Sequence, residues 1–201
     1  MFSGAPFPDT VDSVNAYLGA VPIAQALQGG ADIVIVGRTA DSSLALGPLI
    51  HEFGWRLDDW DRLAAGTLAG HLIECGCQVT GGTFTDWEAV PDWANIGFPI
   101  AEVSADGGCV ITKPEGSGGL VSVATVAEQL LYEVSDPQAY IVPDVVCDFS
   151  DVKIEQQAEN RVAVSGARGY PATDTYQVVA STQRGWRGTF SQVIIGMDAA
   201  R

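Results

Sequence analysis

The chain has 201 residues, 47% of them hydrophobic, which suits one large domain with a sizeable core or one and a half small ones. Ten Lys and Arg residues stand against 25 Asp and Glu residues, for a formal net charge of -15. Such a charge repels nucleic acid and anionic membranes, so we expect neither as a partner. Because Lys113 and Lys153 are the only lysines, each well-placed cation becomes a candidate for substrate binding.

The four cysteines lie in apolar or glycine-rich surroundings and lack the density of a small secreted scaffold; they are Cys75, Cys77, Cys109 and Cys147. This usage predicts reduced thiols. The chain does not open on a signal-peptide pattern, and no apolar run approaches the ~20 residues of a membrane helix. The expected location is therefore the cytoplasm.

The first elements predicted along the chain are a mobile leader, a helix, a strand and a second helix. Glycine and prolines mark residues 1–13 as the leader, and a short helix runs from Pro22 to the glycine pair at 29–30. The run Ile33–Val36 has four β-branched residues without polar alternation, which predicts a strand covered on both faces, as parallel strands are. A helix over Leu44–Phe53 follows.

A second strand, loop and helix unit is predicted further on. An acidic turn leads into a helix over Leu63–Cys75, and Thr80–Thr83 forms a turn. The strand Gly108–Thr112 then meets the glycine loop Lys113–Gly119, and an amphipathic helix over Val121–Val134 follows.

Near residue 136 the helical periodicity gives way to β-type runs punctuated by glycine and proline. We therefore expect an α/β part over 14–136, and a β-rich part over 137–201 that can belong to the same domain. The predicted fold class is α/β, with a parallel or mixed sheet and flanking helices in the first part and a mainly β second part. The expected strands of the second part are Tyr140–Val142, Val145–Phe149, Val152–Glu155, Arg161–Ser165, Tyr176–Thr182 and Ser191–Ile195.

The residues after the run Ile33–Val36 are the first candidates for a site. Glycine, Arg38 and Asp41 follow an expected buried strand, where open α/β sheets place their ligands. Arg38 would bind substrate and Asp41 would act in catalysis. Alternatively, the two side chains pair with each other and cap the next helix.

Glycine loops supply the next candidates. The loop Lys113–Gly119 lies between a strand and a helix, which is the arrangement that presents backbone N–H groups to an anion, although it matches neither a Walker motif nor a dinucleotide fingerprint. The alternative is a turn that needs glycine only for positive φ. The expected substrate-binding set in these loops is Lys113, Gly116, Gly118 and Gly119, with Gly81 and Gly82 from the Thr80–Thr83 turn.

His71, Glu74 and Cys75 share one helix face at positions i, i+3 and i+4. The His71–Glu74 pair suits general acid/base work, whereas a buried core histidine is the alternative. We predict no metal, because Cys77 lies past the helix end and no second ligand pair is nearby. Arg168 lies on an expected loop, where it would bind a substrate carboxylate or dock the loop.

Four long blocks resemble the acyclic terpene utilisation family, of the AtuA type. They are Asn15–Trp55, Asp58–Trp87, Gly97–Ser150 and Asn160–Tyr176. The resemblance implies a role in the catabolism of branched acyl-CoA thioesters, and it implies that this chain corresponds to an internal or C-terminal excerpt of the family's longer proteins. Strand edges left exposed in such an excerpt would favour a homo-oligomer or a complex with other family segments.

Three functions remain open from the sequence. The first is an enzyme of lyase or hydratase type that acts on a branched or unsaturated acyl-CoA or carboxylate, with an anionic small molecule as partner. The second is a non-catalytic subunit or scaffold of a catabolic complex. The third is a nucleotide-binding, ligase-like protein, which the absent phosphate motifs disfavour. The sequence identifies no cofactor.

Overall fold

The computed structural model describes residues 6–183, 185–189, 191 and 193. Residues 1–5 of the expected leader and most of the expected strand Ser191–Ile195 lie outside them. The chain divides into two compact units, one made from residues 1–15 with 178–201 and a larger one over Ala16–Gln177. The larger unit therefore spans the composition change near residue 136.

The smaller unit contains a two-stranded sheet of β1 (Ser13–Ala16) and β9 (Val178–Ser181). The backbone N–H of Asp12 donates to the carbonyl of Ser181 at 2.8 Å, and the Thr182 hydroxyl donates to the carbonyl of Thr10 at 2.9 Å. These bonds extend the pairing beyond the ladder itself.

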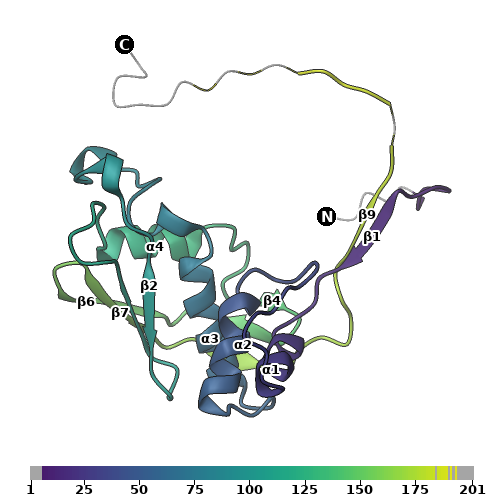
Figure 1. The fold of residues 1–201 in the computed structure, drawn as a ribbon, viewed down its shortest axis with the longest axis horizontal. Helices are drawn as coiled ribbons and strands as arrows, with labels where there is room; N and C mark the ends of the chain where they lie inside the picture. Colours follow the sequence, from purple (N-terminus) through teal and green to yellow (C-terminus); the bar gives the residue numbers. More distant parts are fainter. Residues whose placement is uncertain (1–5, 184, 190, 192, 194–201) are drawn as a thin grey trace. The chain divides into compact units, whose positions relative to one another are not determined.

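Four α-helices form in the described part of the larger unit, each where local signals predict one (Figure 1). Pro22 lies in the first turn of α1, and Ser122 and Thr125 form a capping box at the start of α4. A Cβ atom on Gly70 would lie 2.6 Å from the Ser42 carbonyl oxygen, so glycine lets α3 approach the start of α2 closely. The helices are α1 (Val21–Gln28), α2 (Ser43–Phe53), α3 (Trp60–Ile73) and α4 (Val123–Leu131).

Two sheets and three short 3-10 helices complete the described part of the larger unit. The four-stranded sheet has the order β2-β3-β7-β6, with β2 (Ile100–Val103), β3 (Cys109–Thr112), β6 (Lys153–Ala158) and β7 (Arg161–Ser165). The three-stranded sheet has the order β4-β5-β8, with β4 (Tyr140–Val142), β5 (Val145–Asp148) and β8 (Arg168–Tyr170). The 3-10 helices are η1 (Gly76–Gln78), η2 (Trp87–Ala89) and η3 (Trp93–Asn95).

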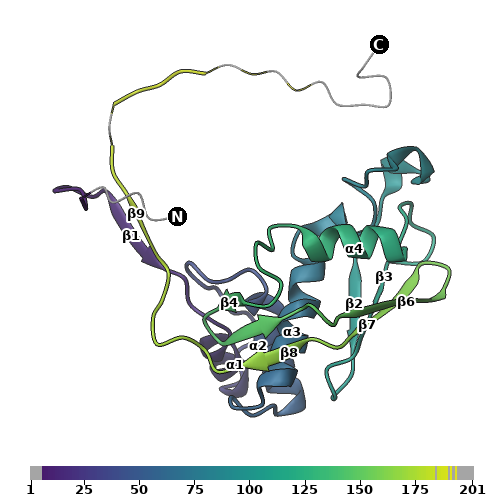
Figure 2. The same cartoon turned by 180° about the vertical axis from the view of Figure 1, so that it is seen from behind.

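Helix α3 is the centre of the larger unit, because it contacts strands of both sheets as well as α2 and α4 (Figure 2). Its apolar side chains lie at helical spacing and are buried, and they meet apolar strand residues that alternate between buried and less buried positions. The fully buried apolar side chains of α3 and of the elements around it include Leu63, Leu72, Ile111, Val126, Val145 and Val162. This helix therefore connects the two sheets of the larger unit to each other and to α2 and α4.

The α/β class, with helices early and mainly strands later, is confirmed. Instead of the parallel or mixed sheet that we expected, the two sheets of the larger unit pair antiparallel throughout. Several neighbouring strands are joined by short turns, which only antiparallel pairing allows. Among the described residues, parallel pairing is confined to isolated bridges, Leu18–Thr39 and Ile96–Gly118.

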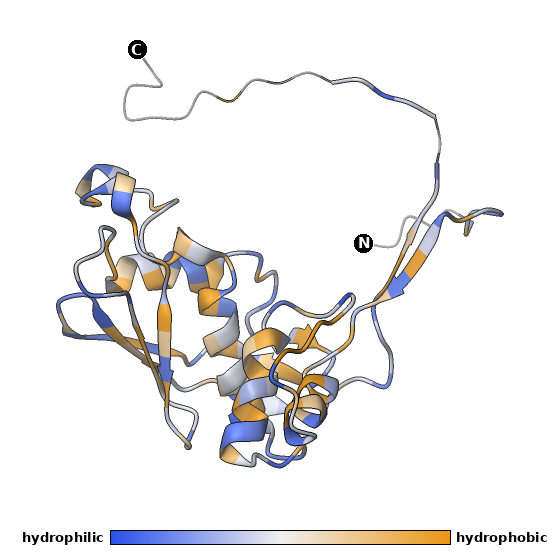
Figure 3. Ribbon diagram, viewed as in Figure 1, coloured by the Kyte–Doolittle hydropathy of each residue, from blue (hydrophilic) through white to orange (hydrophobic). Residues whose placement is uncertain are grey.

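The prediction of a buried strand over Ile33–Val36 is wrong. The segment connects α1 to α2 without a ladder partner among the described residues, and Ile33 and Ile35 are 82% and 92% exposed. It is coloured as one hydrophobic stretch in Figure 3. A strand needs a partner for its backbone groups, and the adjacent pairing begins only at Thr39, opposite Leu18. The apolar run has the composition of a buried strand, but the described residues neither pair with it nor cover it.

Candidate functional site

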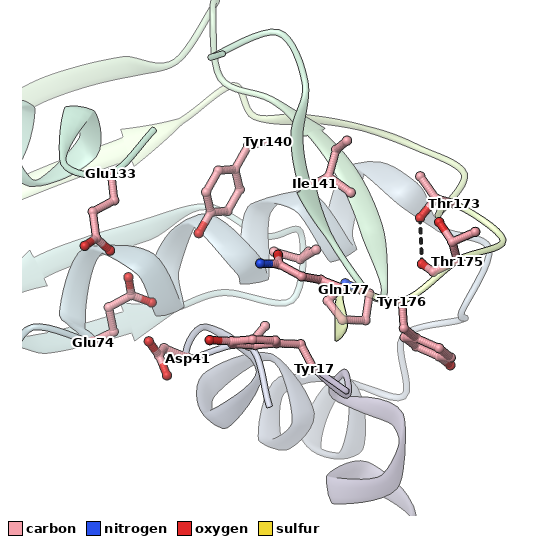
Figure 4. A pocket seen from close by; sticks show the side chains of 13 residues that line it. Tyr17, Asp41, Glu74, Glu133, Tyr140, Ile141, Thr173, Thr175, Tyr176 and Gln177 are labelled. Atoms are coloured by element: carbon pink, nitrogen blue, oxygen red, sulfur yellow. Dashed lines mark hydrogen bonds between the residues drawn. The ribbon is translucent and has the colours of Figure 1, made fainter. Parts of the chain in front are cut away.

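A pocket of about 570 Å³ lies within the larger unit, between segments that are far apart in sequence. Its walls come from Tyr17, the residues just before α2, the C-terminal end of α3, Glu133 after α4, residues 140–143 and the loop 173–177 (Figure 4). This volume is within the range of small-molecule sites. The Thr173 hydroxyl donates to the Thr175 carbonyl at 3.1 Å, which shapes the loop on one side of the opening.

Three carboxylates and three phenols line this pocket. One phenol, Tyr176, points away from the rest in Figure 4, and we call the other five side chains the acidic cluster: Asp41, Glu74, Glu133, Tyr17 and Tyr140. In Figure 4 their oxygen atoms face a shared opening. Glu133 has a left-handed backbone with φ of 59°, a conformation that costs energy for a residue other than glycine. Strain of this kind often accompanies functional sites, and here it lies at the pocket wall.

His71 lies directly behind the acidic cluster. Its side chain is fully buried, and its Nδ1 is 3.1 Å from Oε1 of Glu74, one turn further along α3. The His71 ring packs on Tyr140 with centroids 5.5 Å apart, and Tyr140 packs on Phe149 at 5.4 Å. The imidazole therefore contacts both a carboxylate and a phenol of the cluster and holds them in place from the core side.

The electrostatics of the site keep the Tyr140 phenol protonated. Burial, reinforced by the negative charge of Glu74, raises the pKa of Tyr140 to about 12. Burial also raises the pKa of the neighbouring Cys75 thiol, with Glu74 and Glu133 adding to the effect. At neutral pH the pocket thus offers a phenol that donates hydrogen bonds beside carboxylates that accept them.

The structure brings three of the expected catalytic residues together. Asp41 and Glu74 line the pocket, and His71 contacts Glu74 from behind. Arg38 does not line the pocket, but its guanidinium carbon is 5.4 Å from the ring centroid of Tyr17, which does. Neither an Arg38–Asp41 ion pair nor a side-chain cap of α2 is found in the described chain.

The structure does not bring the glycine loops to the pocket. The Lys113 ammonium donates a hydrogen bond to the carbonyl oxygen of Ser117, 2.5 Å away. The lysine thus binds its own loop and not the pocket. A Cβ on Gly119 would lie 2.8 Å from the carbonyl oxygen of Thr80, and Gly118 is similarly crowded by Asp92. Gly81 packs against Val90, Gly82 against Cys77, and Gly116 has a positive φ of 75° with open space around it. Close packing between loops accounts for most of these glycines.

Arg168 also lies away from the pocket. The expected loop is in fact strand β8, in which Arg168 pairs with Asp148 of β5 across the ladder. The guanidinium lowers the pKa of Asp148, after the larger contributions of the Ser150 hydroxyl and backbone N–H. Arg168 therefore belongs to the edge strand of the three-stranded sheet, where its neighbour is Asp148.

Sequence reasoning missed Tyr17, Glu133 and Tyr140 as site residues. Tyr140 was expected only as the first residue of a strand, and Glu133 as part of a helix that in fact ends at Leu131. The early end of α4 turns the Glu133 side chain toward the pocket. The signal in the sequence was that Glu133 and Tyr140 are polar residues at the edges of apolar runs.

Within the described residues, no group of three His, Cys, Asp or Glu side chains has the arrangement of a metal site. The four cysteines are not joined by disulfides. None of the helices in that part of the chain combines the length and apolarity needed to cross a bilayer.

The fold and the pocket define an α/β protein with an acidic, ligand-sized site beside its central helix. The family model described as acyclic terpene utilisation family protein AtuA matches residues 4–201, and the chain belongs to this family. No curated protein and no solved structure gave a match to this chain.

Proposed function

We propose that the chain carries the acid/base site of a lyase or hydratase that acts on a branched or unsaturated acyl thioester. The observation that carries this proposal is the acidic cluster, in which the protonated phenol of Tyr140 and the carboxylate of Glu74 face one pocket. A hydrogen-bond donor and a proton acceptor on one substrate are what such reactions require.

The roles follow from the contacts. Glu74 takes a proton from water while the water oxygen bonds to the β-carbon, and the electrons of the double bond move onto the thioester carbonyl. Tyr140 donates a hydrogen bond to that oxygen, and the proton held by Glu74 returns to the α-carbon, so water is added and no redox partner is needed. Asp41 orients the water, and His71, which is fully buried, positions Glu74.

The charge of the pocket favours a thioester over a free carboxylate. Three carboxylates line the pocket and none of its lining residues is Lys or Arg, so an anionic head group would be repelled there. A thioester carbonyl is neutral. The anionic part of a CoA ester would remain outside, where Arg38, which packs on the lining residue Tyr17, is the cation that we assign to it.

Glu74→Gln is expected to lower turnover of a 2-enoyl thioester at least about 100-fold, because the amide cannot accept the proton. The measurement is the loss of the conjugated-thioester absorbance, screened with linear and branched acyl groups. Glu88→Gln, an equal change at an exposed position in η2, is the control and should keep wild-type turnover. Wild-type protein that leaves the whole panel unchanged, or equal turnover in both variants, would contradict the proposal.

A second function, assembly with another copy of the chain, is favoured by the exposed segment Ile33–Val36. We propose that two copies pair there in antiparallel fashion about Ile35. Such a two-fold pairing places Asp32 opposite Arg38 of the partner subunit, so opposite charges flank the apolar run at both ends. The pairing would bury the apolar side chains and satisfy backbone groups of an unpaired segment.

Ile35→Lys is expected to convert the dimer to a monomer, because two like charges would face each other at the centre of the pairing. Sedimentation over a range of protein concentrations measures the result. Leu131→Lys makes the same change at another exposed apolar residue, at the end of α4, and should leave the dimer intact. Wild-type protein that stays monomeric at tens of micromolar, or a dimer in both variants, would refute assembly through this segment.

A further inference from the structure

A trough continues from the acidic cluster along the surface of the larger unit; its middle part is apolar, and Gln25, Gln28 and His51 add polar groups at its far end. Next to the acidic pocket lies a second hollow of about 270 Å³, and the two share the lining residues Pro143 and Tyr176. A third hollow of about 340 Å³ shares Val21, Ile50 and Leu57 with the second. The three hollows thus form one row within the described residues, with the acidic cluster at one end.

The chemistry of the lining changes along this row. The second hollow is lined almost entirely by apolar side chains, and its one carboxylate, Asp144, already accepts the backbone N–H of Ala20 at 2.9 and 2.8 Å. Three of its lining residues are unusually exposed for their type: Leu18 at 44%, Leu57 at 49% and Tyr176 at 61%. Exposed apolar side chains gathered in one hollow indicate a binding surface.

We infer that this trough is the subsite for the apolar acyl chain of the substrate. The inference rests on the proposed function, because it takes the thioester to lie in the acidic cluster. From there the chain passes between Pro143 and Tyr176 and lies against Leu57 and Val21. The residue pair Pro143 and Tyr176 forms the gate between head and tail, and Leu57, shared by both distal hollows, limits the chain length that is preferred.

A ligand series with one head group and chains of increasing length tests the subsite. Acyl thioesters of N-acetylcysteamine with four to ten carbons carry no anionic nucleotide, and their affinity is measured by calorimetry. Burial of a methylene contributes about 0.8 kcal/mol, so affinity is expected to rise by up to about fourfold with each added carbon.

Ala172→Trp places an indole in the trough from the loop that forms one of its walls, and Ala172 is only half-buried, so the fold should tolerate the change. The ten-carbon ligand is expected to bind at least about tenfold more weakly, and the four-carbon ligand as in the wild type. Ala94→Trp, on the exposed η3 turn, is the control and should match the wild type. Leu57→Gln, at an exposed position on another wall, should also flatten the dependence on chain length.

The outcomes separate the subsite from the reaction. Affinity that is independent of chain length in the wild type, or an equal loss for short and long ligands in Ala172→Trp, overturns the subsite even if turnover is found. A rise with chain length that Ala172→Trp abolishes and Glu74→Gln preserves supports the subsite even if no turnover is found. Binding is therefore read independently of the chemistry assigned to Glu74.

Discussion

His71→Ala is expected to lower the free energy of unfolding by about 3 kcal/mol, with a fall in Tm of roughly 6–12 °C. The imidazole is fully buried between α3 and β4, where it packs on Tyr140 and contacts Glu74. Alanine would leave a cavity under the ring and deprive Glu74 of its partner. Chemical denaturation of the variant and the wild type measures the difference.

Two further variants separate packing from hydrogen bonding. His71→Phe keeps a ring against Tyr140 but removes the contact of Nδ1 with Glu74, so it should recover about half of the lost stability. His51→Ala removes the other histidine, which is exposed near the end of α2, and should change stability by less than about 0.5 kcal/mol. An equally small effect of His71→Ala would show that the ring does not support the site.

Local signals predicted most of the elements that build the site. The helix expected over Leu44–Phe53 forms over Ser43–Phe53, and the strand Tyr140–Val142 has the expected bounds. Turn residues, helix N-terminal signals and short apolar runs determine local structure within a few residues. The elements that they form can therefore be predicted from one stretch of the chain. The pairing of His71 with Glu74 was predictable for the same reason, because both lie on one face of one helix.

The choice of partner in space could not be read in this way. Ile33–Val36 has the composition of a buried strand. A strand is buried only if other segments pack on it, and the local sequence does not show which segments these are. None of the described residues does so. Lys113 was a candidate because lysine is scarce, yet its ammonium is taken by a carbonyl four residues away. Tyr140 meets Glu74 only because β4 packs beside α3, a contact between segments more than sixty positions apart.

Asp144 shows how much a distant partner can contribute. The residue follows β4 and accepts the Ala20 backbone N–H with both carboxylate oxygens, 124 positions away, while its Oδ2 lies 3.5 Å from the Ser43 hydroxyl. These contacts satisfy the start of α1, whose own N-cap side chain is an alanine and cannot do so. Gly19 leaves the space for the carboxylate, since a Cβ there would overlap it.

Asp144→Ala is therefore expected to destabilise the fold by about 3 kcal/mol, because the N–H groups at the start of α1 would lose their hydrogen-bond acceptor. Asp151→Ala, an equal change at an exposed residue, should cost less than about 0.5 kcal/mol. Urea denaturation of the two variants and the wild type provides the comparison. Similar losses in both variants would mean that the link between β4 and α1 is dispensable.

The pH dependence of this loss has a definite sign. Burial raises the pKa of Asp144, against the opposing effect of the hydrogen bonds from Ala20, Val21 and Ser43. A carboxyl whose pKa is higher in the folded state binds its proton more tightly there, so its contribution is largest below the unfolded pKa and declines as pH rises through the folded pKa. The stability difference between wild type and Asp144→Ala should accordingly be larger in mild acid than at neutral pH. A difference that instead grows with pH would show that the hydrogen bonds outweigh burial and hold the carboxylate in its charged form.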